Sequence, residues 1–148
     1  MDNKQDDMDY IIQYCVCANL RKVARVVTQS YEKQMKTIGL KITQYYMLIN
    51  IVRYKGISIS ELGENMLLDQ TTVTRNVNIL EKNSYVNIKK DEGDSRIKSI
   101  VITEQGLAKL EEATPIWSQI QKRIEASIGE EKYKELLETL TQIQTSFS

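Results

Sequence analysis

The chain has 148 residues, of which 27% are charged and 41% are apolar, and its formal net charge at pH 7 is zero. These values predict one domain of a soluble globular protein. The chain has no histidine and two cysteines, which excludes a Ser-His-Asp triad and a histidine-dependent zinc site, so we expect no metal and no cofactor.

Neither a membrane span nor a signal peptide is predicted, so we expect a cytoplasmic protein. No apolar run approaches the roughly 18 residues of a membrane span, and the N-terminus is acidic and polar, unlike a signal peptide. Lys and Arg slightly outnumber Asp and Glu in residues 40–103, whereas residues 104–148 are acidic. This distribution fits a DNA-facing centre, although basic domains are the easier case for nucleic-acid binding.

The first predicted helix spans about residues 9–38, and Gly39 is expected to end it. The residues before Met8 are expected to be frayed. Apolar side chains repeat along this helix at intervals of three and four, at Ile12, Val16, Leu20, Val23 and Val27. A helix of about thirty residues is long for a small protein and needs a partner surface along its length, which indicates a dimer.

A second helix is predicted over about Ile42–Lys55, and a short extended piece over Ile57–Ile59. Ser58 and Glu61 have the spacing of a capping box, so a short helix is expected to begin there. Gly63 inside that helix is expected at a place where another helix crosses closely.

A fourth helix, Asp69–Lys82, completes a helix-turn-helix pattern with the short helix before it. Asp69 is a good N-cap, and an apolar face made by Val73, Val77 and Leu80 is expected to be buried. The opposite face has hydroxyl, amide and cationic side chains and no carboxylate, at Thr71, Arg75, Asn78 and Lys82. Such a face suits the major groove of DNA; the alternative is the solvated face of an ordinary surface helix.

The pattern then changes to a period of two, which predicts a β-hairpin. Its strands are Tyr85–Lys90 and Arg96–Ile102, and Asp91–Ser95 has the composition of a turn. Basic side chains on its two arms are expected to meet phosphates; they are Lys89, Lys90, Arg96 and Lys98. A hairpin placed directly after a recognition-like helix is a wing.

The rest of the chain is predicted to be helical, starting directly after the N-cap Thr103. Pro115 is expected to kink or break this helix near Thr114, and Ser127 with Glu130 has capping-box spacing for a last helix. Both chain ends are therefore amphipathic helices. We expect them to be buried against a second subunit across a two-fold axis; the alternative is that they pack on their own winged domain.

Five short segments together resemble the MarR family of bacterial winged helix-turn-helix regulators. They are G-L-K-I-T-Q at 39–44, I-S-E-L-G at 59–63, D-Q-T-T-V-T-R-N-V-N-I-L-E at 69–81, D-E-G-D-S-R at 91–96 and V-I-T-E-Q-G at 101–106. Their order and spacing make the resemblance specific. It extends towards both ends through C-V-C-A-N-L-R at 15–21 and P-I-W at 115–117.

The resemblance implies a mainly α fold with a small β-hairpin wing, in one compact protomer. Residues 41–103 would form the winged helix-turn-helix, and residues 1–40 and 104–148 the helical dimerisation region of a homodimer. Each subunit would place its recognition helix in the major groove of one half of a palindromic operator, and its wing in the neighbouring minor groove. Asp94 would hold Arg96 at the DNA; the alternative role for Asp94 is that of a turn former.

The expected contacts with double-stranded DNA come from three places. They are Thr71, Thr72, Thr74, Arg75, Asn78 and Lys82 in the helix, Lys89, Lys90, Asp94, Arg96 and Lys98 in the wing, and Ser58 and Ser60 at the DNA backbone. The function expected is that of a repressor released by a signal. The alternative is a winged-helix module that binds a protein partner, for which the zero net charge is the main support. An enzyme is not expected, since the sequence offers no nucleophile-base pair.

Two kinds of signal are open, and the first is thiol oxidation. In the MarR family, organic-hydroperoxide regulators carry a sensing cysteine early in the first helix, a spacing that Cys17 and Tyr31 match. These two residues lie roughly 21 Å apart along one helix, so they would touch only across an antiparallel dimer. Cys15 and Cys17 lie about 200° apart around a helix and would need unwinding to bridge each other. The alternative is that both are small apolar residues of the dimer core.

The second kind of signal is a small phenolic or aromatic ligand, bound between the dimerisation helices and the winged domain. The candidate lining residues are Tyr45, Tyr46, Met47 and Trp117.

Overall fold

The computed structural model describes residues 2–148, and the side chains of residues 4–148. Its elements are α1 (Asp2–Tyr14), α2 (Val16–Met35), the 3-10 turn η1 (Lys36–Ile38), α3 (Ile42–Tyr54), β1 (Ile57–Ser58), α4 (Ile59–Met66), α5 (Gln70–Lys82), β2 (Val86–Lys90), β3 (Lys98–Ile102), α6 (Glu104–Ile128) and α7 (Glu130–Phe147). Within residues 2–148, no helix combines the length and the apolar character needed to cross a membrane.

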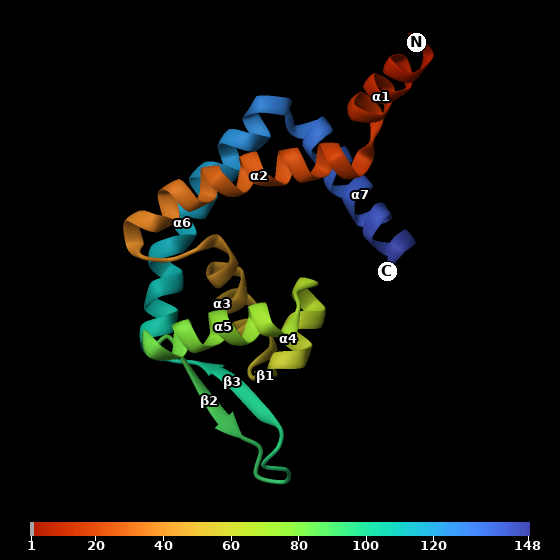
Figure 1. Ribbon diagram of the computed structural model, residues 1–148. Helices are drawn as coiled ribbons and strands as arrows, with labels where there is room; N and C mark the ends of the chain where they lie inside the picture. The colour runs from red at the N-terminus through yellow and green to blue at the C-terminus, as the bar shows by residue number, and fades with distance from the viewer. Residues whose placement is uncertain (1) are drawn as a thin grey trace.

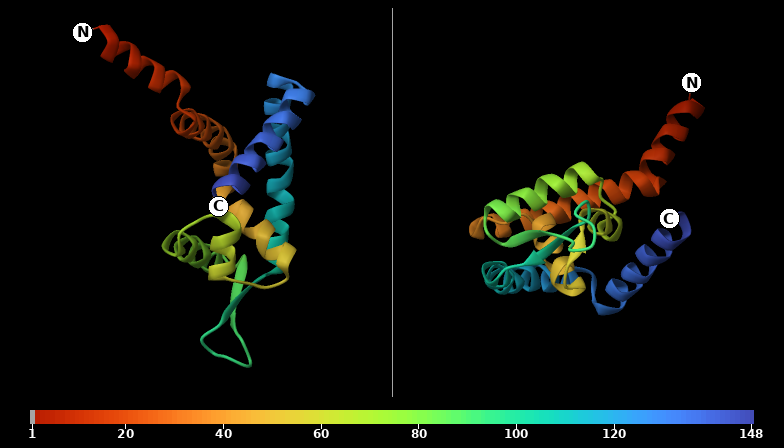
Figure 2. Two further views of the ribbon diagram at one scale, coloured as in Figure 1. Left: turned by 90° about the vertical axis from the view of Figure 1, so that its right-hand side faces the viewer. Right: turned by 90° about the horizontal axis from the view of Figure 1, so that it is seen from below.

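The elements form two regions. Helices α3, α4 and α5 pack with the small sheet, and the hairpin of β2 and β3 projects from this body (Figure 1). Helix α2 and the second half of α6 lie beyond the body, with α7 folded back beside them, and α1 projects away from the rest of the chain in every view (Figures 1 and 2).

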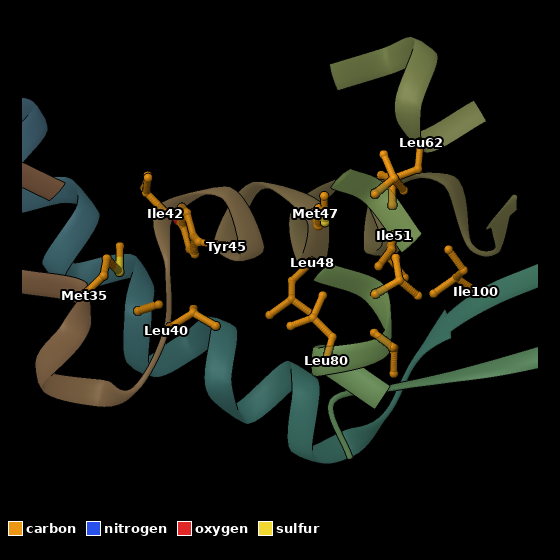
Figure 3. Packing of buried hydrophobic residues seen from close by; sticks show 14 of the residues in the cluster. Met35, Leu40, Ile42, Tyr45, Met47, Leu48, Ile51, Leu62, Leu80 and Ile100 are labelled. Carbon is orange, nitrogen blue, oxygen red and sulfur yellow. The ribbon is translucent and has the colours of Figure 1, made fainter. Parts of the chain in front are cut away.

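The hydrophobic core is centred on α3. Met47, Leu48 and Ile51 of this helix are buried almost completely, and so are Leu80 of α5 and Leu62 of α4 (Figure 3). Val73 and Val77 of α5 are buried as well, which confirms the predicted inner face of this helix. Each such aliphatic side chain contributes about 1.5–3 kcal/mol of burial free energy, so α5 is held firmly along one face.

The wing is part of a three-stranded antiparallel sheet of order β1-β3-β2. The predicted hairpin is confirmed, with Val86 opposite Ile102 and Lys90 opposite Lys98. Its second strand begins at Lys98 rather than at Arg96, because Ile97 donates its N–H to the Asp94 carbonyl (3.0 Å) inside the tip. The pairing of β1 with β3 was not predicted, since it joins residues about forty positions apart.

The predicted single N-terminal helix is wrong in two respects. Helical structure begins at Asp2, before the expected start, and it is interrupted at Cys15, which has an extended ψ of 113°. Asn19 donates its amide to the carbonyls of Gln13 (3.0 Å) and Cys15 (2.9 Å). The break is therefore compensated by a side chain that satisfies carbonyl groups at the end of α1. Gly39 has a φ of +71°, as expected of a residue that ends a helix.

Two predictions for the C-terminal helices need correction. Of the kink or break expected at Pro115, the break is wrong, because α6 runs through Pro115 to Ile128; the proline deprives the Glu111 carbonyl of its usual donor. Ser127 does not cap α7, since it still lies inside α6 and donates its hydroxyl to the Ile124 carbonyl (2.6 Å). The N-cap position of α7 is instead Gly129, with a φ of +88°.

The predicted caps of the helix-turn-helix are confirmed. Ser58 and Glu61 form a reciprocal capping box, with Glu61 N–H donating to Ser58 Oγ (3.1 Å) and Ser58 N–H donating to the Glu61 carboxylate (2.9 Å). Asp69 accepts the N–H of Thr72 (2.8 Å) at the start of α5. Gly63 packs against the turn and α5, because a Cβ there would lie 3.0 Å from the Leu68 carbonyl oxygen, which is tight, and 3.5 Å from a methyl group of Val73, which is an ordinary contact.

A second close approach, at Gly106, joins α6 to the chain segment between α5 and the wing. A Cβ at Gly106 would clash with the Tyr85 carbonyl oxygen and lie 2.8 Å from Ile102 Cγ1. The same carbonyl accepts the N–H of Thr103 (3.1 Å), so the segment is tied to its place and has little room to move away.

Gly106→Ala is therefore expected to lower the free energy of unfolding by about 1–3 kcal/mol, the usual cost of overpacking a tight site. Urea unfolding followed by circular dichroism measures this change. The exposed neighbour provides the control: Gln105→Ala is expected to alter stability by less than about 0.5 kcal/mol. Equal stability of Gly106→Ala and the unsubstituted protein would contradict the close approach.

Candidate nucleic-acid interface

The outer face of α5 is polar, exposed and free of carboxylates. Thr71, Arg75 and Asn78 are exposed, while Val73 and Val77 on the opposite side are fully buried. Together with Gln70 and Thr74 these three outer residues line a shallow hollow along the helix. Lys82 is exposed in the last turn. The helix can therefore present hydroxyl, amide and guanidinium donors to an edge of a base pair.

Thr72 differs from its neighbours, because its polar groups form hydrogen bonds within the protein. Its N–H and its hydroxyl both donate to the Asp69 carboxylate, at 2.8 and 2.7 Å. These hydrogen bonds lower the pKa of Asp69, so the N-cap stays ionised and accepting as the pH falls below the range of an ordinary aspartate. Among the predicted recognition residues, Thr72 is thus the one whose hydroxyl donates to the N-cap of α5.

A second hollow lies between the starts of α4 and α5 and the part of the wing where β3 begins. Its lining includes the predicted backbone residues Ser58 and Ser60 and two predicted wing residues, Arg96 and Lys98. Predicted residues from two separate segments are therefore brought together on one surface. The hydroxyl of Ser58 donates to the Glu61 carboxylate (2.8 Å), whereas Ser60 is exposed.

Gln70 was not predicted as a site residue, although it lines both hollows. It is the first residue of α5 and it is exposed. One feature of the sequence could have identified Gln70. It follows the N-cap directly, so its side-chain amide lies beside the free N–H groups at the start of the helix.

At the wing tip, Asp94 holds the guanidinium of Arg96 by two parallel hydrogen bonds. Arg96 Nε and Nη2 lie 3.0 Å from the two carboxylate oxygens, and the Arg96 N–H donates to the same carboxylate (3.0 Å). The side chain of Arg96 is nevertheless 88% exposed. The pair lowers the pKa of Asp94, so both groups are charged at neutral pH. Asp94 is therefore more than a turn former, since it orients a long cation that faces solvent.

The arms of the wing carry the other predicted cations. Lys89, Lys90 and Lys98 are exposed, and Lys90 lies directly across the hairpin from Lys98. Like charges in directly opposed positions repel each other and weaken the hairpin. A polyanion lying along the wing would relieve this repulsion.

The predicted redox pair is not brought together within one protomer. Cys17 is exposed near the start of α2, and Cys15 is half-buried at the break between α1 and α2. Tyr31 is buried near the end of α2 and donates its hydroxyl to Gln121 Oε1 (2.8 Å). The Gln121 amide in turn donates to the Tyr133 hydroxyl. Burial raises the pKa of Tyr31 to about 12, so its hydroxyl remains a donor.

The predicted ligand residues do not line one cavity. Met47 is fully buried in the core (Figure 3), and Tyr45 is buried with its hydroxyl 3.2 Å from Thr114 Oγ1. Tyr46 is partly exposed and lies next to Trp117; burial raises the pKa of Tyr46, and a hydrogen bond with Trp117 opposes that rise. An apolar groove of about 690 Å³ does lie between α3 and α6, and Tyr45 is the one predicted residue among those that line it.

A helix-turn-helix whose second helix is polar on its outer face, followed by a hairpin wing, defines the winged-helix class of DNA-binding proteins. The model of the MarR family matches residues 40–98. The regulator SarZ of Staphylococcus epidermidis is 30% identical over 124 residues, covering 82% of this chain and 81% of SarZ. The chain belongs to the MarR family of transcriptional regulators.

Two other comparisons agree with this assignment. The organic hydroperoxide resistance transcriptional regulator of Bacillus subtilis is 28% identical over 116 residues, which are 78% of each chain. The crystal structure of the M. tuberculosis regulator MosR is 27% identical and superposes with a TM-score of 0.77, covering 91% of this chain and 98% of MosR. These proteins are regulators of transcription and not enzymes, and the MosR structure confirms the predicted winged helix-turn-helix fold.

The Asp94–Arg96 pair can be tested by a double-mutant cycle on DNA binding. Arg96→Ala is expected to weaken binding to a duplex selected from random DNA about tenfold. Asp94→Ala is expected to weaken it less, because the arginine remains but is no longer oriented. The double variant is expected to match Arg96→Ala alone. Fluorescence anisotropy measures the affinities.

The control for charge is Glu92→Ala, which also removes one carboxylate from the wing tip and is expected to leave binding unchanged or stronger. If Asp94→Ala and Arg96→Ala had independent, additive effects, the holding role of Asp94 would be excluded.

Proposed function

We propose that the protein is a homodimeric repressor that binds a palindromic operator, with one recognition helix in each half-site. The observation that carries this proposal is the outward face of α5, where Thr71, Arg75 and Asn78 are exposed on a helix whose other face is locked into the core. MosR of M. tuberculosis, which is 27% identical, has been crystallised in complex with DNA. Arg96 at the wing tip then contacts the neighbouring minor groove, and the wing lysines contact phosphates.

The dimer is supported by apolar side chains that nothing covers in a single chain. Ile11, Ile12 and Tyr14 of α1 and Val23 of α2 are each more than half exposed. Along α7, all of whose residues are described, no side chain is buried, and the adjacent Leu136 and Leu137 are each more than two-fifths exposed. Exposed apolar side chains along three helices mark an interface, and a second copy with two-fold symmetry is the simplest partner. Residues 1–40 and 104–148 are thus the dimerisation region, and residues 41–103 bind DNA.

The proposed binding to DNA also explains the position of the wing lysines. Lys90 and Lys98 oppose each other on neighbouring strands, which is unfavourable in the free protein and favourable beside a phosphate backbone. A protein-binding module would gain from this arrangement only with an acidic partner.

Thiol oxidation is the signal that the chain supports best. Cys17 is exposed, and the 28% identical relative from Bacillus subtilis is an organic hydroperoxide resistance regulator. A hydroperoxide oxidises the thiol to a sulfenic acid and leaves as the alcohol. Because Cys17 lies in the proposed dimer region, a polar group there disturbs the separation of the two recognition helices. A small phenolic or aromatic ligand in the groove between α3 and α6 is the second candidate, supported by the size and lining of that groove.

Selection of bound duplexes from random DNA tests the proposed function. A two-fold symmetric site is expected, with half-sites about 34 Å or one helical turn apart, and affinity for it is expected to fall steeply with salt. Arg75→Ala is expected to cost about 1–3 kcal/mol of binding free energy, whereas Arg123→Ala, which removes an exposed arginine of α6, is expected to have little effect. Selection of no symmetric site, or equal affinities of the two variants, would overturn the proposal.

Oxidation of Cys17 is tested by titrating the protein with cumene hydroperoxide and measuring operator affinity. The unsubstituted protein is expected to lose affinity at least tenfold, while Cys17→Ser is expected to bind normally and to keep its affinity in peroxide. Cys15→Ser serves as the matched control and is expected to respond as the unsubstituted protein does. A normal peroxide response of Cys17→Ser would exclude this residue as the sensor.

A further inference from the structure

One lysine of α6 lies where three parts of the fold meet. The side chain of Lys109 is only 16% exposed, and its ammonium group donates to the backbone carbonyl of Ile38 (3.0 Å) and to the carboxylate of Glu112 (2.6 Å). The same nitrogen is 5.7 Å from the centroid of the Tyr85 ring, a distance at which a cation is attracted to an aromatic face. The charge is therefore held by three partners at once.

Two of these partners, Ile38 and Tyr85, lie at or just beyond the ends of α2 with its η1 turn and of α5, the two helices on which the proposed function depends. Ile38 is the last residue of η1, which continues α2, so its carbonyl has no acceptor role within the helix and is satisfied by Lys109. Tyr85 follows α5 after a short turn and donates its N–H to the Leu80 carbonyl (2.9 Å). Lys109 thus connects the end of the proposed dimerisation helix α2 with the end of the recognition helix α5.

The segment that contains Tyr85 is rigid, so it can transmit this connection. The Tyr85 carbonyl accepts the Thr103 N–H (3.1 Å), the Ser84 carbonyl accepts the Thr103 hydroxyl (2.6 Å), and Gly106 leaves no room beside them. A rotation of α5 about its end would have to move this segment and break the contact with Lys109. Among the described residues, two other side-chain hydrogen bonds join α2 to later helices, and neither reaches α5: the Ile42 N–H at the start of α3 donates to Glu32 (3.1 Å), and the Tyr31 hydroxyl donates to Gln121 of α6 (2.8 Å).

We propose that Lys109 is a positioning residue that fixes the recognition helix relative to α2, and thereby sets the half-site spacing that the dimer accepts. This inference rests on the proposed dimeric operator binding. Two-fold symmetry doubles any change in the orientation of α5, because both copies move in opposite directions about the axis. A matched pair of helices reads one spacing well, whereas a loosened pair tolerates several spacings and binds the best one less tightly.

Direct contact of Lys109 with DNA does not account for its arrangement. Its ammonium group is enclosed by Ile38, Glu112 and Tyr85, and the lysines that face solvent near the recognition helix are those of the wing and Lys82. A purely stabilising role predicts a different result from a positioning role, because general destabilisation lowers binding to every duplex in the same proportion.

The test uses the symmetric duplex selected from random DNA, together with versions whose central spacer is one base pair shorter or longer. Lys109→Met keeps the aliphatic stem but removes the ammonium donors. It is expected to lower affinity for the original spacing about tenfold, the loss of a charged hydrogen bond being of that order, and to lower affinity for the altered spacings much less. The ratio between original and altered spacing therefore falls. Lys109→Arg, which keeps the charge, is expected to restore part of that ratio.

The matched control is Lys134→Met, which removes the same charge from an exposed lysine paired with Glu130 (2.7 Å) on α7. It is expected to leave the spacing ratio unchanged. Thermal melting establishes that each variant is folded at the temperature of the binding measurement. An unchanged spacing ratio in folded Lys109→Met, with or without a uniform loss of affinity, would overturn the positioning role. A protein without any spacing preference before substitution would instead overturn the proposed dimeric operator binding itself.

Discussion

The packing of α5 against α3 is the constraint on which the rest of the molecule depends. Val73, Val77 and Leu80 enter a core built around Met47, Leu48 and Ile51, and none of these six side chains is more than 1% exposed. A helix buried along one face cannot rotate about its own axis without exposing that face, at a cost of several kcal/mol. The buried face of α5 therefore fixes the direction in which Thr71, Arg75 and Asn78 point. Polar groups on an exposed helix surface recognise a partner only when their backbone is held in this way.

Local hydrogen bonds also fix the conformation of the turn before α5 and of the wing tip. The turn between α4 and α5 is closed by Leu67 in a left-handed conformation and by the Leu68 N–H donating to the Gly63 carbonyl (2.9 Å), and Asp69 then caps the next helix. At the wing the same principle applies to a single side chain, since Asp94 orients Arg96. A protein with zero net charge can thus present a concentrated set of donors, because three carboxylates near this surface, those of Glu61, Asp69 and Asp94, are engaged with caps and with that arginine. The distribution and orientation of charge matter more here than its sum.

Much of the fold and most of the candidate interface were predictable from the sequence, because local signals decide the structure of the winged region. The winged region is built from short elements with strong local signals: capping residues at Ser58 and Asp69, a helical period in α5 and a period of two in the wing. Where the sequence prediction was wrong, local signals were overruled. Pro115 lies within a continuous α6, Ser127 is still helical, and the helix expected over residues 9–38 is interrupted at Cys15. Met47 was placed in a ligand site by residue type alone, yet it faces the core because of its position on α3.

By itself, the sequence determined the class of the protein, the helix-turn-helix and its caps, the inner and outer faces of α5, and the pairing of Asp94 with Arg96, because each depends on residues a few positions apart. Tertiary structure decided the rest. The approach of Lys109 to Ile38 and Tyr85, the joining of β1 to β3, and the gathering of Ser60, Gln70 and Lys98 on one surface all connect residues far apart in the chain. Such contacts depend on how complete elements pack against one another, and no local pattern of residues encodes that packing.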